Sequence, residues 1–238
     1  MTATFVPTQT SGFRAAGVLP IADADLGTAT KPLLRGRLHQ LCALASLPLG
    51  ARLVSGAGPD PGNRIAAVAY AVTWTAMFLT SAAYHRLAQS ETARRRMRRA
   101  DHSMIFVHIG GTATSLGLCS LTPMATLLVL AAVWTGVAGG VGVKVTRLVD
   151  GGSAGSWMYG VLGGTQALAM PLVSASLDLG QVALLAASGV AYGVGALLFF
   201  RKRLDLFPTV FGYHEVWHCF TLVGGLCQYL LIAQLVQS

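Results

Sequence analysis

The sequence predicts an all-α integral membrane protein, a bundle of seven transmembrane helices. Charged residues make up only 11% of the 238 residues, against about 25% in a typical soluble domain, and the mean hydropathy is +0.59. Such a chain has too few charges to cover a surface that faces water. Seven stretches also come close to the roughly 20 predominantly apolar residues that a membrane helix needs.

Those stretches fill the chain after a polar beginning. Residues 1–30 lack the apolar core and cleavage pattern of a secretion signal, so we expect a polar, mobile tail before one membrane domain at 31–238. The first span is the weakest, because Arg52 interrupts it and must reach toward a membrane surface. The predicted spans are 38–58, 65–84, 102–121, 124–143, 157–177, 181–200 and 211–236.

The basic residues are distributed unevenly between the two sides of this predicted bundle. Fifteen of the 17 Lys and Arg residues precede the first span or fall in the connections after the second, fourth and sixth spans, which leaves Arg52 and Arg64 opposite. The positive-inside rule then predicts a cytoplasmic N-terminus and an external C-terminus, in the plasma membrane. The net charge of +8 is thereby explained without nucleic-acid binding, and we expect the arginine-rich connection 91–100 to contact anionic lipid headgroups.

Histidines with helical spacing mark the start of the last span. His214 and His218 stand in the sequence HEVWH, and positions i and i+4 of a helix share one face about 5–6 Å apart. Both imidazoles can therefore hold one metal ion, and ionisable side chains in an apolar span usually mark a site. Ser81 and His85 have the same spacing at the end of the second span, and Asp101 opens the third.

These residues can converge, because the end of the second span and the starts of the third and seventh lie on one membrane face. Three imidazoles and a water are the ligands of an open, catalytic zinc site. Asp101 would hydrogen-bond the water or a ligating imidazole, and Ser81 would donate to the same water or to a polarised carbonyl. An aspartate at a helix start can equally serve as an N-terminal cap.

Other ionisable or reactive side chains carry weaker expectations. His39, in the opening turn of the first span, is expected to be an anchor at the membrane surface. His108 lies seven residues after Asp101 and on about the same helical face, without an assigned role. The four cysteines fall inside predicted spans without C-x-x-C spacing, so free thiols are expected.

Taken together, the motifs resemble those of the hemolysin III family, which belongs to the progestin and adiponectin receptor (PAQR) group of seven-helix proteins. The motifs are K-P-x-x-R-G-x-x-H before the first span, S-x-x-x-H closing the second, D-H-S opening the third and H-x-x-x-H opening the seventh. The resemblance runs from about Lys31 to the C-terminus. It implies an internal N-terminus and a Zn²⁺ ion held by His85, His214 and His218, which Asp101 reaches through water. Gln228 departs from the family, which often has a histidine near that position.

Three functions are compatible with these residues. The first is a zinc-dependent intramembrane hydrolase of lipid amides or esters, ceramidase-like and linked to membrane homeostasis, with membrane lipids as substrate. The second is a non-catalytic membrane sensor or regulator that binds lipid and has structural zinc. Haemolysis is a phenotype that either class can produce.

The third function is a site-2-type zinc protease, in which Glu215 of HEVWH is the general base. No Asp or Glu follows His218, so its third ligand would have to be an upstream acid, Asp101 or Asp178.

Overall fold

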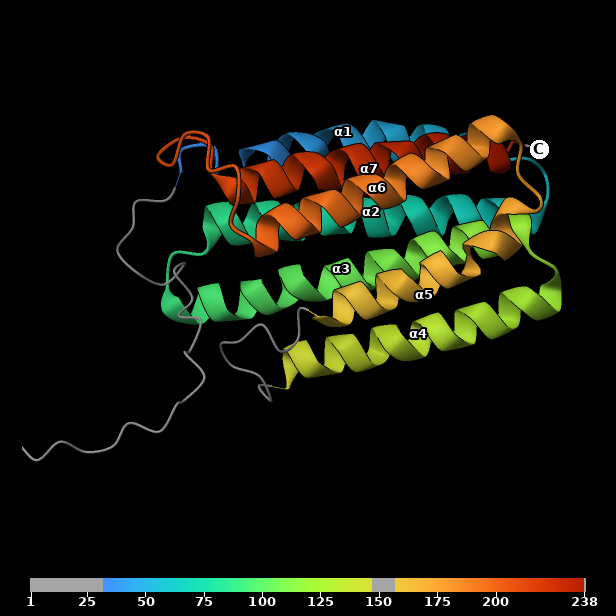
Figure 1. The fold of residues 1–238 in the computed structure, drawn as a ribbon, viewed down its shortest axis with the longest axis horizontal. Helices are drawn as coiled ribbons and strands as arrows, with labels where there is room; N and C mark the ends of the chain where they lie inside the picture. Colours follow the sequence, from blue (N-terminus) through green and yellow to red (C-terminus); the bar gives the residue numbers. More distant parts are fainter. Residues whose placement is uncertain (1–31, 147–156, 238) are drawn as a thin grey trace, which may run out of the picture.

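A computed structural model describes residues 32–146 and 157–237, and within them the chain is all-α, as predicted (Figure 1). The predicted tail at 1–30 lies outside the described residues. An isolated bridge between Phe207 and Phe211 is the one β-type pairing in the described part. The helices are α1 (Arg37–Ser55), α2 (Pro61–Leu87), α3 (Glu91–Ser120), α4 (Pro123–Val145), α5 (Trp157–Ser174), α6 (Leu179–Phe200) and α7 (Tyr213–Leu235).

Five of these helices are long and apolar enough to cross a membrane, namely α2, α3, α4, α6 and α7. Their large aliphatic side chains remain exposed in the isolated chain, and Leu127, Leu128 and Val190 are examples at 63% exposure each. Such a surface is stable against lipid rather than against water. The chain is therefore a multi-pass integral membrane protein.

Local capping sets several of the helix starts. Thr122 accepts a hydrogen bond from the Ala125 amide at 3.4 Å and precedes Pro123. Proline suits the first helical position because an N–H there would have no acceptor within the helix. Asp178 and Gln181 form a reciprocal capping box at the start of α6. These predicted boundaries agree with the structure to within a few residues.

The start of the third helix is different from the prediction. We expected it near Asp101, with the arginine-rich stretch before it as a connection, but α3 begins at Glu91. Ser90 caps it by accepting from the Ala93 amide at 3.1 Å, and arginine is a good helix former. Asp101 therefore lies three turns inside the helix and is not an N-terminal cap.

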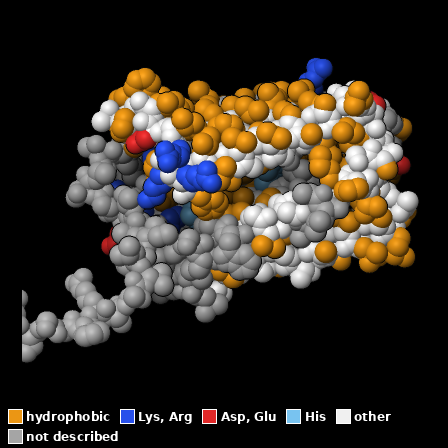
Figure 2. Space-filling view, in the orientation of Figure 1, with side chains coloured by type: hydrophobic (Ala, Val, Ile, Leu, Met, Phe, Trp, Pro, Cys, Tyr) orange, Lys and Arg blue, Asp and Glu red, His pale blue; other side chains and the backbone are white. Residues whose placement is uncertain are grey.

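Successive helices run in opposite directions along the long axis of the bundle (Figure 1). The starts of α1, α3 and α7 and the end of α2 thus meet at one end, on the left of the view. Basic side chains gather near this end on the face shown in Figure 2. The histidines that the sequence singles out come from these same helix ends.

The core of the bundle is centred on α2. Tyr70, Trp74 and Phe78 are each 2% exposed or less and pack against residues of α7, among them Ile232. The Tyr70 hydroxyl donates to the Gly225 carbonyl at 2.6 Å, which ties α2 to α7 in the middle of the bundle. All four cysteines are free, as predicted. The packing of α2 against α7 fixes the relative positions of their histidines.

Candidate metal centre

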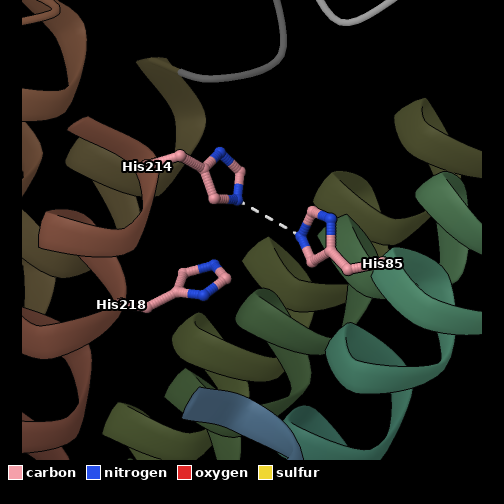
Figure 3. Close-up of side chains that lie close together, drawn as sticks. All are labelled: His85, His214 and His218. Atoms are coloured by element: carbon pink, nitrogen blue, oxygen red, sulfur yellow. Dashed lines mark hydrogen bonds between the residues drawn. The ribbon is translucent and has the colours of Figure 1, made fainter. Parts of the chain in front are cut away.

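Three histidines meet at one end of the bundle. His85 is in the last turn of α2, whereas His214 and His218 are in the first two turns of α7. Figure 3 shows their rings turned toward one another across the gap between the two helices. One ring nitrogen from each lies within 4.8 Å of the other two. The structure therefore brings together the three residues that the sequence predicts as metal ligands.

The distance between two of the rings suits a zinc ion. The Nε2 atoms of His85 and His214 are 3.2 Å apart, and two nitrogens at 2.0–2.1 Å from a tetrahedral zinc are separated by about 3.3 Å. The Nδ1 atom of His218 is buried and has no hydrogen-bond partner, so the protein does not already satisfy that ring. Neutral imidazole is a preferred zinc ligand. The donor set fits the metal, and the spacing of His85 and His214 matches it.

Ser81 and Asp101 form a hydrogen-bonded pair next to the histidines. The Ser81 hydroxyl donates to the Asp101 carboxylate, which links α2 to α3. Ser81 is 3% exposed and lies one turn before His85 on the same helix. The two predicted catalytic residues are thus in contact with each other, one helical turn from a predicted ligand.

Glu215 lies between the two histidines of α7 in sequence but has partners of its own. One carboxylate oxygen, Oε2, accepts from the Gly212 amide at 2.9 Å at the start of the helix. The other, Oε1, accepts from the Arg35 guanidinium in a salt bridge whose two side chains are 9% and 1% exposed. Both oxygens are engaged, so the Glu of HEVWH is a structural acid at the helix start in this structure.

The remaining histidines have different environments. His39 is 5% exposed, and its ring stacks on that of His218, so the prediction of a surface anchor is wrong. The segment before α1 folds against the connection before α7 and buries this ring. His108 is also buried, and its Nδ1 atom is 3.3 Å from the Thr73 hydroxyl.

Two residues beside the site were not predicted from the sequence. Arg35 reaches Glu215, and Gly36 lies against His85. The signal was present in the motif K-P-x-x-R-G-x-x-H, whose Arg, Gly and His are Arg35, Gly36 and His39. Nothing in that spacing shows which distant residues it meets.

Comparisons with known proteins agree with the fold and the motifs. The sequence profile of a family described as "Haemolysin-III related" matches residues 28–229. The chain is 27% identical to "Hemolysin-3" of Bacillus cereus over 197 residues, which cover 82% of this chain and 86% of that protein. It is 26% identical to "Hemolysin-3 homolog" of Bacillus subtilis (strain 168) over 163 residues, 68% of this chain and 73% of the relative.

Proposed function

The chain belongs to the haemolysin-III-related family, part of the progestin and adiponectin receptor group, and on this premise we propose that it is a zinc-dependent hydrolase of membrane lipids. The bond cleaved is an amide or an ester. The observation that carries the proposal is the convergence of three imidazoles within a membrane bundle, with a carboxylate held by a serine one turn away. Zinc sites with three protein ligands and an open fourth position are typical of catalytic rather than structural zinc.

The proposal includes α1 and α5 as membrane spans. With 19 and 18 residues, these helices extend about 28 Å and 27 Å, close to the hydrocarbon thickness of about 30 Å. Both run along the other five (Figure 1). With seven spans, the uneven distribution of Lys and Arg supports an N-terminus and a histidine site on the cytoplasmic side and a C-terminus outside, in the plasma membrane.

The chemistry is divided among the residues at the site. A zinc ion held by His85, His214 and His218 would supply Lewis acidity, polarising a carbonyl and making water more acidic. The Asp101 carboxylate accepts the proton of the attacking water and passes it to the leaving amine or alcohol. The Ser81 hydroxyl, which donates to Asp101, holds that carboxylate in place. The lipid chains lie against the apolar helices.

The positions of Glu215 and Asp101 favour this reading over a protease. A zinc protease with HEVWH needs the Glu215 carboxylate free to act as general base. That carboxylate instead accepts hydrogen bonds from Arg35 and Gly212. Asp101, in contrast, has as its hydrogen-bond partner Ser81, which lies one turn before His85 on α2.

A second candidate is supported by the origin of the ligands. His85 comes from α2, whereas His214 and His218 come from α7, so a bound zinc would fasten two helix ends together. In a sensor or regulator this cross-link is the whole role of the metal, and no turnover occurs. The two candidates differ in what Asp101 does, because a purely structural zinc needs no proton acceptor.

Three purified proteins distinguish the candidates: the wild type, Asp101→Asn and Glu215→Gln. Each is assayed for zinc content and for release of fatty acid from a fluorescent ceramide and a matched ester in detergent micelles. We expect Asp101→Asn to keep zinc and lose about 10²–10⁴-fold in rate. Glu215→Gln breaks the buried pair with Arg35 and should lower zinc content and rate together. A zinc-loaded but inactive Glu215→Gln beside an active Asp101→Asn would assign the general base to Glu215 instead of Asp101. Zinc-loaded wild type without release of fatty acid would favour the sensor.

A further inference from the structure

The segment Arg35–His39 packs against the three-histidine site and contacts Glu215, His85 and His218. It leads into α1, and the chain just before it is held to the connection before α7 by backbone hydrogen bonds. The Leu33 amide donates to the Thr209 carbonyl at 3.0 Å, and the Leu34 amide donates to the Val210 carbonyl at 3.1 Å. The segment is therefore anchored to the element that carries two of the three histidines.

Its first contact is the salt bridge between Arg35 and Glu215. Arg35 is 7% exposed and Glu215 is 1% exposed. Breaking a buried pair leaves an uncompensated charge and is costly. Because Glu215 also caps the start of α7 through the Gly212 amide, the pair fixes the first turn of α7, where His214 and His218 originate.

Its second contact is between Gly36 and His85. The backbone of Gly36 has φ of 78°, in the left-handed region that favours glycine. A Cβ added there would lie 2.6 Å from the Cβ of His85, well inside van der Waals contact. Any larger residue at this position must therefore push the segment and His85 apart.

Its third contact is the stack of His39 on His218. The ring centroids are 3.7 Å apart and the planes differ by 11°. The Thr221 hydroxyl donates to the His218 carbonyl at 2.9 Å, so its one hydrogen is used. The 3.4 Å contact from His39 Nε2 is thus a donation to the Thr221 oxygen. This bond fixes the plane of His39, and the stack fixes the plane of His218.

We propose that Arg35, Gly36 and His39 are positioning residues for the metal centre. Arg35 sets the start of α7 through Glu215. Gly36 allows the segment to approach His85, and His39 sets the ring plane of His218. Together they reach both helices that supply the ligands, without supplying a ligand themselves. Residues that orient metal ligands are worth about 10–100-fold in metal affinity. The proposal rests on the metal site of the proposed function, and it adds a role for the motif before α1.

The test measures metal binding by the full-length protein in detergent micelles, with no activity assay. The variants are Gly36→Ala, His39→Ala and His39→Phe, and Gln40→Ala is the matched control because Gln40 is an exposed neighbour on the same helix. Zinc affinity is measured by competition with a chromogenic chelator. The visible spectrum of the Co²⁺-loaded protein reports ligand geometry, and thermal unfolding without metal reports the stability of the fold.

We expect Gly36→Ala and His39→Ala to bind zinc about 10–100-fold more weakly and to change the Co²⁺ spectrum. His39→Phe keeps an aromatic ring against His218 and should recover most of the affinity. Gln40→Ala should match the wild type. If Gly36→Ala does not fold, the two His39 variants still decide the question.

Two results would count against different claims. Variants that lose stability without metal but keep the wild-type zinc affinity and Co²⁺ spectrum would overturn the positioning role, since the segment would then only support the fold. A wild type that binds neither metal would instead overturn the proposed function.

Discussion

The Nε2 atoms of His85 and His214 lie 3.2 Å apart, although 129 residues separate them in the chain. Two neutral imidazoles gain little from each other at this distance beyond one hydrogen bond. A shared metal ion gives a stronger reason for such an approach within a membrane bundle.

Replacement of any one of the three histidines by alanine should remove the metal. We expect one zinc per wild-type chain, and strongly reduced zinc in His85→Ala, His214→Ala and His218→Ala, because each change takes away one of three protein ligands. Elemental analysis of detergent-purified protein measures this. His108→Ala is the matched control, since His108 is buried but bonded to Thr73 instead. Full zinc occupancy in His85→Ala would remove α2 from the site.

The orientation of the bundle is testable with reporters. A reporter fused after Ser238 should be external, and one inserted at Gln89 should be internal, because most Lys and Arg residues lie on the Gln89 side of the predicted topology. Gln89 is in the short connection between α2 and α3, so the insertion interrupts neither helix. Alkaline phosphatase and green fluorescent protein fusions give complementary signals. An internal C-terminus would rule out seven spans with this N-terminal orientation.

Close packing between α3 and α4 depends on a glycine. A Cβ at Gly140 would lie 2.6 Å from the ring of Phe106, which is fully buried. Gly140→Ala should therefore destabilise the protein by about 1–3 kcal/mol, the usual cost of overpacking. The midpoint of thermal unfolding in detergent measures the loss. Gly142→Ala, in the same helix with nothing within 4 Å of its Cβ, should be neutral, and equal midpoints would contradict the packing argument.

The helices and the meeting of the three histidines were predictable because their signals are local. Apolar length and capping residues such as Pro123 set the spans, and helical spacing with alternating direction brings His85 to the side of His214 and His218. The start of α3 was missed because five arginines suggested a connection, whereas Ser90 begins a helix there. Charge shows where a helix leaves the hydrocarbon, but it does not show where the helix ends.

The surroundings of the three histidines were not predictable. Arg35 and Glu215 are 180 residues apart in the chain. His39 contacts Thr221 across 182 residues. No local pattern encodes such a pairing. The burial of Arg35, the positive φ of Gly36 and the stacking of His39 can be recognised only once the helices are packed.

The length of α3 has a consequence for how a substrate would arrive. Its 30 residues extend about 45 Å, some 15 Å more than the hydrocarbon of a typical bilayer. The excess corresponds to the arginine-bearing turns before Asp101. When the apolar remainder of α3 fills the hydrocarbon, the Asp101 carboxylate lies at the depth where acyl chains join their headgroups. A lipid could then bring its linkage to the site by sliding sideways within its own leaflet, without being lifted out of the bilayer.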